Sequence, residues 1–284
     1  MYEIKSILLP FNTTQPTMGS ARAACDIASE HNSYIEGAYY HQNMPLIAGE
    51  GITLPGDYLM EFEEESGRQA KLSESSFMSL VSKFEIPFES TESSRSSTHA
   101  SWRDMTDMSP NNMGEYARLF DLSIIERRDA SDTLNWKATA EMLIFDSGRP
   151  VMIVGSNIPE KIGRKVVIAW NGSIESVRAV MASRPFLERC EELVILQVEG
   201  GMTPGPDAMQ ISKYLEKVGI HGSVELIDTD GASIGGSILR FAQDHCCDLL
   251  IKGAFTQSRF RQLIFGGATR EILEEGAVPV LFCH

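Results

Sequence analysis

The chain has 284 residues, of which 43% are hydrophobic and 23% charged, and its formal net charge at pH 7 is -14. This composition is typical of one large globular domain or two ordinary ones, and the negative charge argues against nucleic acid or an anionic membrane as a partner. The N-terminus does not resemble a signal peptide, no apolar run is long enough to span a membrane, and the five cysteines do not form a disulfide pattern. We therefore expect a cytoplasmic protein.

The first part of the chain alternates predicted strands and helices. The hydrophobic pattern predicts a strand over 4–11, a helix over 18–31 and a strand over 34–40. A Gly- and Pro-rich loop over 44–56 follows, then a long helix from Tyr58 to about Phe84, a Ser-rich loop over 89–98 and a strand over 99–105. The series ends with a helix over 111–120, a strand over 122–126, a helix over 132–146 and a strand over 150–154.

The pattern then restarts after a linker over 156–163. Residues 7–12 align with 166–171, residues 121–125 with 248–252, and residues 149–151 with 278–280, in the same order. The extra residues of the first copy fall between Met44 and Thr98. Three matches in one order favour an internal repeat over coincidence, so we predict two domains, 1–155 and 163–284.

Each copy is expected to alternate five strands with four helices. This alternation predicts an α/β fold, a parallel sheet with helices on both faces, and the near-continuous apolar strands fit such a doubly covered sheet. Ligands of open α/β sheets bind beyond the carboxyl ends of the strands, where the strand order reverses. In the second copy this rule points to residues 169–171, after the first strand, and to residues 253–269, after the fourth.

The stretch 253–269 places glycines at a defined spacing. Gly253 ends a predicted strand, Thr256 follows, and the pair Gly266-Gly267 precedes a helix that is expected to start at Ala268-Thr269. Glycine lets the backbone approach a ligand closely, and the first N–H groups of a helix attract an anion. The spacing is too wide for a P-loop, and no Gly-Lys-Ser/Thr is present.

This pattern resembles the C-terminal signature of the universal stress protein family, which in nucleotide-binding members reads Gly-x-x-Gly, nine residues, then Gly-Ser/Thr. Gly253 and Gly266 match it, whereas Thr256 replaces the second glycine and Gly267 replaces the Ser/Thr. The resemblance covers essentially the whole chain, in a tandem two-domain form. It implies two open, doubly wound, parallel five-stranded sheets with strand order 3-2-1-4-5, whose fifth strands pair side by side. This intrachain pseudo-dimer is also open to assembly as a homodimer.

The resemblance further implies that the second domain is the one to hold ATP or AMP. Family members that bind ATP place an acidic residue after the first strand, where this chain has Asn171, close to Ala169, and Val198 at the end of the second strand would line the base. The residues expected around the phosphates are Gly253, Thr256, Gly266, Gly267, Ala268 and Thr269. An amide binds ribose hydroxyls less strongly than a carboxylate, so the departures predict weak or lost binding. The alternative, that these glycines only shape a turn and a helix start, stays open.

The first copy is expected to hold a poorer site. Asn12 follows its first strand, and Glu126 stands where the second copy has Gly253. A carboxylate at that position would crowd and repel a phosphate. The next residues, Arg127 and Arg128, are suited either to an anion or, as we favour, to a solvated or interdomain role.

We find no motif for catalysis or metal binding. The cluster His245-Cys246-Cys247 and the pair Cys283-His284 lack the spacing of zinc ligands, and Cys246 is expected to lie in the core. The stretch 228–236 is expected to be a loop and a helix N-cap. No acidic residue is placed as a general base beside the glycine loop. We therefore expect a regulatory or binding stress-response protein, with a slow ATPase or other hydrolase, and a partner-binding module without ligand, as alternatives.

Overall fold

The computed structural model describes residues 3–12, 18–40, 56–89, 98–106, 112–128, 136–254 and 267–284, without the side chains of 56–59 and 62. The elements of the first half are β1 (Ser6–Phe11), α1 (Met18–His31), β2 (Tyr34–Tyr39), α2 (Gly56–Lys83), β3 (His99–Asp104), α3 (Asn112–Tyr116), the 3-10 helix η1 (Ala117–Leu119), β4 (Leu122–Glu126), α4 (Trp136–Asp146) and β5 (Val151–Val154). Those of the second half are β6 (Lys165–Ala169), α5 (Ile174–Ala182), α6 (Arg184–Leu187), β7 (Glu192–Val198), α7 (Ala208–Lys217), β8 (Ser223–Ile227), α8 (Ile234–Asp244), β9 (Leu249–Gly253), α10 (Ala268–Glu275) and β10 (Val280–Cys283).

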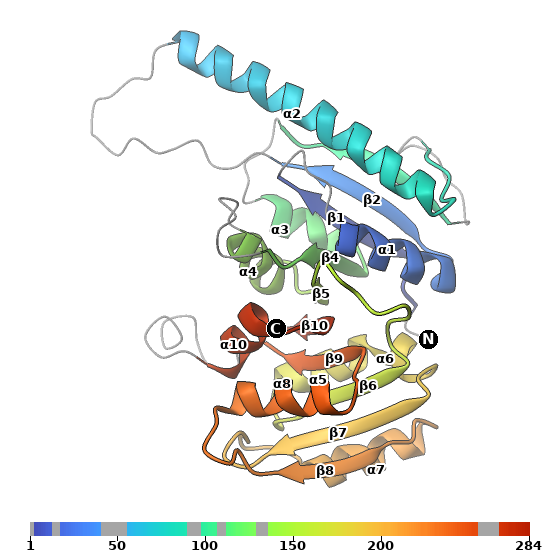
Figure 1. Ribbon diagram of the computed structural model, residues 1–284, viewed down its shortest axis with the longest axis vertical. Helices are drawn as coiled ribbons and strands as arrows, with labels where there is room; N and C mark the ends of the chain where they lie inside the picture. The colour runs from blue at the N-terminus through green and yellow to red at the C-terminus, as the bar shows by residue number, and fades with distance from the viewer. Residues whose placement is uncertain are drawn as a thin grey trace.

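The predicted order of strands and helices is confirmed in the first half, with differences at the ends of elements. The helix expected over 111–120 is divided into α3 and η1, and it stops because Phe120 is extended, with φ -112° and ψ 152°. The helix expected over 132–146 is described from Trp136 onward. The long α2 extends beyond the sheet at the far end of the first half (Figure 1).

The ten strands form one sheet, in the order β3-β2-β1-β4-β5-β10-β9-β6-β7-β8. Each half therefore has the order third, second, first, fourth, fifth, and its strands are parallel. The halves meet where β5 and β10 pair antiparallel, with Ile153 opposite Val280 and Met152 opposite Leu281. The α/β class, the strand order and the pairing of the fifth strands are confirmed. The two expected sheets are fused into one, because each fifth strand satisfies the open edge of the other. The domain boundaries at 155 and 163 stay a prediction.

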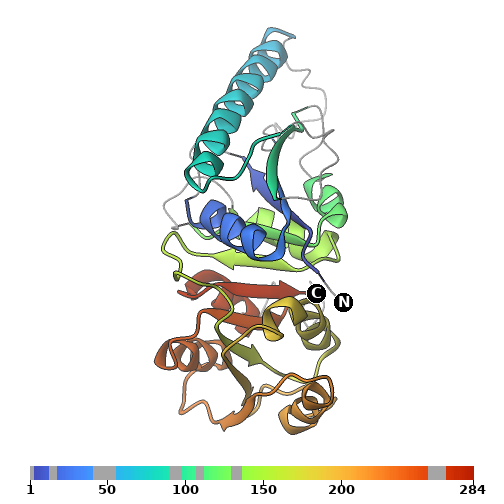
Figure 2. The ribbon, with the colours of Figure 1, turned by 90° about the vertical axis from the view of Figure 1, so that its right-hand side faces the viewer.

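The junction is buried on both faces of the sheet. Met152 and Leu281 belong to the hydrophobic core on one face, and Ile153 and Val280 belong to the core on the other. All four side chains are at most 1% exposed, and full burial of such a side chain stabilises a fold by about 1.5–3 kcal/mol. Figure 2 shows the helices on both sides of the sheet and the close approach of β5 and β10 at its middle. The two halves therefore share continuous cores.

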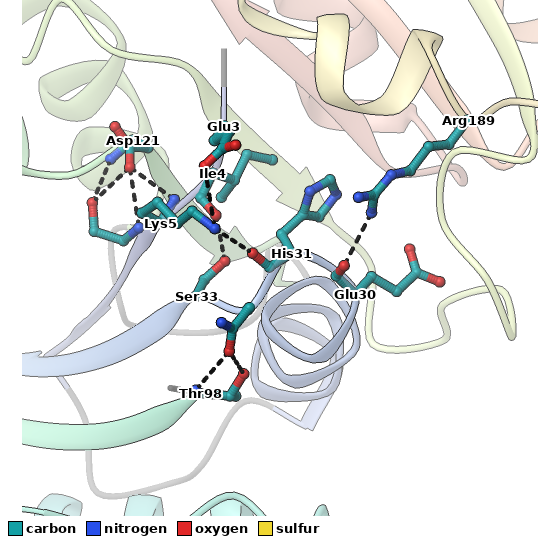
Figure 3. Close-up of polar contacts among 11 residues, drawn as sticks. Glu3, Ile4, Lys5, Glu30, His31, Ser33, Thr98, Asp121 and Arg189 are labelled. Carbon is teal, nitrogen blue, oxygen red and sulfur yellow. Dashed lines mark hydrogen bonds and ion pairs between the residues drawn. The ribbon is translucent and has the colours of Figure 1, made fainter. Parts of the chain in front are cut away.

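Equivalent aspartates hold the first strand of each half at its amino end. Asp121 Oδ2 accepts hydrogen bonds from the backbone N–H of Lys5 (2.9 Å) and Ser6 (3.1 Å), as Figure 3 shows. Asp248 accepts in the same way from Gly163 (2.8 Å) and from the residues that begin β6. Asp121 and Asp248 are the residues that the sequence repeat aligns, so the repeat reaches individual side-chain contacts.

A second contact between the halves lies near this end. The ring of His31, the last residue of α1, meets the Phe186 ring edge-on with centroids 5.8 Å apart. Close to it, Arg189 Nη1 donates to the Glu30 carbonyl oxygen at 3.0 Å (Figure 3). His31 is 9% exposed. Burial, together with the positive charge of Arg189, lowers the pKa of His31. The ring is therefore held neutral at this contact.

Candidate functional site

The carboxyl ends of β6, β7 and β9 bring four predicted site residues to one edge of the sheet. Ala169 pairs with Leu196 of β7 and with Lys252 of β9, so Val198 and Gly253 end the strands on either side of β6. Asn171 lies two residues beyond the end of β6. Ala169 and Val198 are buried. The edge between β6 and β9 is the place where the strand order reverses, as expected for a ligand site in this architecture.

Asn171 is engaged by the surrounding chain. Its side-chain oxygen accepts hydrogen bonds from the backbone N–H of Ser173 (3.2 Å) and from the Ser176 hydroxyl. Its backbone oxygen accepts from both the N–H (2.9 Å) and the hydroxyl (3.0 Å) of Thr203, in the segment that follows β7. Both oxygens of Asn171 therefore stabilise local structure around the start of α5.

Gly253 is required for packing. A Cβ atom there would lie 2.4 Å from the backbone nitrogen of Ser176 and 2.6 Å from the carbonyl carbon of Glu175. Only a residue without a side chain lets the first turn of α5 approach β9 so closely. Gly253 belongs to β9 itself and does not have positive φ. Contact with α5, and not a turn, is therefore what requires a glycine at this position.

The start of α10 lacks a side-chain cap. Gly267 is the N-cap residue, it is extended with φ -120°, and a Cβ atom at this position would meet no neighbouring atom. Ala268 follows, and the buried hydroxyl of Thr269 accepts a hydrogen bond from Lys252 Nζ at 3.0 Å. Thr256 and Gly266, the other predicted phosphate-binding positions, lie outside the described residues.

Lys252 was not predicted as a site residue. It is 8% exposed, and its Nζ also donates to the Gly253 carbonyl oxygen at 2.9 Å. Burial lowers the pKa of Lys252 to about 8, and the negative charge of Glu175 acts in the opposite direction. The sequence contained a signal for it, because a lysine interrupts an apolar strand where the first copy has Ile125.

A hollow of about 460 Å³ lies between the first turn of α8 and the length of α10, and it includes Gly267 and Ala268 at the start of α10. Glu271, Glu274 and Glu275 line it, and Glu271 Oε2 accepts from the Ser233 hydroxyl at 2.6 Å. Ser233 caps α8 by accepting from the backbone N–H of Gly236 at 2.9 Å, which confirms the N-cap expected in this loop. Arg270 is the cation of this lining, so its carboxylates outnumber its positive charges.

In the first half, Glu126 occupies the start of α1. Its Oε2 accepts a hydrogen bond from the backbone N–H of Ser20 at 3.1 Å, and the backbone of Gly19 donates to the same carboxylate. Glu126 is 9% exposed, and burial raises its pKa against the lowering effect of these two hydrogen bonds. The first N–H groups of a helix attract anions, and here a side chain of the protein itself takes that place. This contact gives a physical reason for the expected loss of a phosphate site in the first half.

Arg127 points to the second half. Its Nε donates to the Leu273 carbonyl oxygen at 2.7 Å, its Nη2 donates to that of Ile272 at 3.3 Å, and its Nη1 donates to that of Gly276. These carbonyls belong to the end of α10, where a cation is favourable. Of the two roles left open by the sequence, the contacts therefore assign the interdomain role to Arg127.

The cysteines are distributed differently from the expectation. Cys246 is exposed and has a φ of 49°, so its predicted core position was wrong, whereas its neighbour Cys247 is buried. The chain turns at Cys246 after α8, and this turn directs the next side chain inward. Among the described residues, no group of three or more His, Cys, Asp and Glu side chains is arranged to hold a metal ion. No helix in the described part of the chain is long and apolar enough to cross a membrane.

No family model matches the chain. The universal stress protein Slr1230 of Synechocystis sp. is 38% identical over 69 residues, which are 24% of this chain and 23% of that protein. A universal stress protein structure from Archaeoglobus fulgidus covers 99% of this chain and 97% of its own, with a TM-score of 0.66 and 16% identity. Over those 69 residues the chain is homologous to a universal stress protein, and over its full length it has the fold of the Archaeoglobus fulgidus universal stress protein structure. A putative universal stress protein from Pseudomonas aeruginosa has the same fold, with a TM-score of 0.52, 14% identity and 99% and 93% of the two chains covered.

Proposed function

We propose that this universal stress protein homologue is a cytoplasmic stress-response protein that works by binding rather than catalysis. Its second half holds ATP or AMP weakly, at the carboxyl ends of β6 and β9. The observation that supports this most directly is the difference between the halves. In the first half the Glu126 carboxylate occupies the helix start, whereas the second half has Gly253 at the aligned position and an α10 start without a side-chain cap.

Weak binding follows from the departures at residues 171 and 267. A carboxylate after the first strand is replaced by Asn171, whose side-chain oxygen is already used by Ser173 and Ser176. A hydroxyl is replaced by Gly267. A hydrogen bond to a charged group contributes about 1.5–3 kcal/mol, so the loss of two weakens binding by about two to four orders of magnitude.

The surroundings favour binding over hydrolysis. A general base must reach the attacking water at hydrogen-bond distance. In the described part of α10, the Glu271 carboxylate is turned to Ser233 and the Glu274 carboxylate is paired with Lys137 at 2.8 Å. Neither carboxylate is directed to the start of the helix.

Calorimetric titration of nucleotide-free protein with ATP and with AMP at pH 7 tests the proposal. The decisive variant is Gly267→Asp, because a Cβ atom fits there and aspartate is a favourable N-cap. It places a carboxylate at the start of α10, as Glu126 does at α1. Gly67→Asp on α2, where a Cβ atom also meets no neighbour, is the control with the same change in charge.

We expect weak, saturable binding in the wild type and in Gly67→Asp, and its loss in Gly267→Asp. The absence of binding at millimolar nucleotide would favour the partner-binding module. Micromolar binding would show that the departures at residues 171 and 267 do not weaken the site. Release of phosphate from ATP that stops in Gly267→Asp would favour the hydrolase.

A further inference from the structure

Lys252 places a positive charge inside the protein, directly under the first turn of α10. Its side chain rises from β9, and its two acceptors are the Gly253 carbonyl oxygen and the Thr269 hydroxyl, at 2.9 and 3.0 Å. An ammonium group has three N–H donors. The third has no acceptor in the part of the chain that the structure describes.

The two acceptors of Lys252 are neutral, so neither of them balances its charge. Glu175, on α5, is the charged group whose field reaches Lys252, and no described carboxylate forms an ion pair with Nζ. The carboxylate of Glu271 on α10 is held by Ser233 at the start of α8. The sequence 255–266, which connects β9 to α10, contains no Asp or Glu and adds Arg259 and Arg261.

Two positive features therefore converge at this place. An isolated buried ammonium is costly unless it is paired, and the start of a helix carries a partial positive charge that disfavours a cation. In the first half, the aligned strand has the apolar Ile125, and the helix start is neutralised by Glu126. The second half has the opposite arrangement, because Lys252 adds a cation and Gly253 stands where the first half has the acidic Glu126.

We propose that a phosphate group of the bound ligand is the counter-ion of Lys252, and that the site binds this anion together with a proton on Lys252. This inference rests on the proposed function, since it describes the same site. It makes Lys252 a binding residue and makes the affinity depend on pH in a defined direction.

The direction follows from the charge of Lys252. In the free protein its pKa is about 8, because burial disfavours the ammonium form. A phosphate beside Nζ stabilises the ammonium and raises that pKa. Binding is therefore strongest where Lys252 is already protonated, below about pH 8, and weakens as the pH rises through this value. For a free pKa near 8, the affinity should fall about tenfold between pH 7 and pH 9.

The test is calorimetric titration with ATP and with inorganic tripolyphosphate at pH 7, 8 and 9. The second pKa of a phosphate monoester is about 6, so the charge of ATP changes little over this range. Tripolyphosphate loses its last proton in this range, so its pH dependence is evaluated as the difference between the wild type and Lys252→Met. Two variants accompany the wild type, Lys252→Met, which keeps an unbranched chain of similar length in the core, and Lys213→Met, which removes an exposed lysine of α7 as the charge-matched control. Urea unfolding confirms that both variants fold.

We expect the wild type and Lys213→Met to lose about tenfold in affinity from pH 7 to pH 9. Lys252→Met should bind about tenfold or more weakly at pH 7, with a pH dependence that is nearly flat. Titrations in two buffers of different ionisation enthalpy should show proton uptake at pH 8.5 in the wild type and none in Lys252→Met.

The outcomes separate the two proposals. Binding of ATP and tripolyphosphate with the same pH dependence in Lys252→Met as in the wild type would overturn the role of Lys252 and leave the nucleotide site standing. If the wild type binds tripolyphosphate but not ATP, this would support the role of Lys252 and overturn the nucleotide proposal. Binding of neither ligand to the wild type would overturn both.

Discussion

Replacing Glu126 tests whether its carboxylate caps α1. Glu126→Ala leaves the backbone N–H of Ser20 without its acceptor in a site that is 9% exposed. An unsatisfied buried donor costs about 1–3 kcal/mol, so we expect the free energy of unfolding to fall by this amount. Glu126→Gln keeps an acceptor of nearly the same shape and removes the charge. Because burial raises the pKa of Glu126, desolvation of the charge outweighs its hydrogen bonds, and Gln should stay within about 1 kcal/mol of the wild type.

Urea unfolding at pH 7 and pH 5 measures both variants against the wild type. A folded-state pKa above the unfolded value means that folding takes up a proton as the pH falls, so the wild type should gain stability relative to Glu126→Gln on acidification. Equal stability of Glu126→Ala and Glu126→Gln at pH 7 would refute the capping role. A loss of wild-type stability relative to Gln on acidification would show that the hydrogen bonds dominate over burial.

Two further predictions concern the contacts between the halves. Ile153→Ala should lower the free energy of unfolding in urea by about 2–5 kcal/mol, with a coupling energy to Val280→Ala of about 0.2–1 kcal/mol, since the two residues are opposite across the junction. The control variant Val167→Ala on β6 should show no coupling to Ile153→Ala. Two separate unfolding transitions, with the midpoint of only one shifted by Ile153→Ala, would contradict the shared core. The pKa of His31 is lowered in the folded state, so the contribution of this residue to stability is present above the unfolded value of about 6.5 and is lost as the pH falls from that value through the lower folded-state pKa. The charged groups that act on His31 are Arg189, Glu30, Lys5 and Glu3, and all of them stay in place in His31→Phe. Because this variant removes the titrating ring, the free energy of unfolding should change less between pH 7 and pH 5 than in the wild type. An unchanged pH dependence would exclude His31 as the origin of the effect.

The sequence was sufficient for the fold because the repeat constrains it. Apolar strands such as 166–169 and 249–251 are buried on both faces, and the aligned aspartates Asp121 and Asp248 make equivalent contacts. The end of the helix over 111–120 was less accessible to sequence reasoning. It depends on the extended backbone of Phe120 and on tertiary packing, which periodicity does not encode.

The candidate site was predicted less completely, because contacts between distant residues decide it. Gly253 was selected for a possible ligand, yet its geometry is imposed by Glu175 and Ser176, more than seventy positions earlier in the chain. Lys252 was overlooked, because one lysine in an apolar strand shows neither its burial nor its contact with Thr269 in the sequence. The spacing of the motif located the carboxyl ends of the strands as the candidate site. Only the packing of the folded chain showed that Gly253 has a structural role and that Lys252 is a buried cation.

Helix α10 is the element in which the two halves and the candidate site meet. Its first turn lies on Lys252, its last carbonyls accept from Arg127, and Glu274 pairs with Lys137 of α4. This eight-residue helix is therefore contacted by the candidate site at its start and by the first half at its end. Glu126 and Arg127 are consecutive in the chain. Glu126 accepts a hydrogen bond from the start of α1, and Arg127 donates to the carbonyl groups at the end of α10. The two halves therefore differ in physical terms: the first half supplies the anchor Arg127, and the second half has the exposed helix start and the buried cation Lys252.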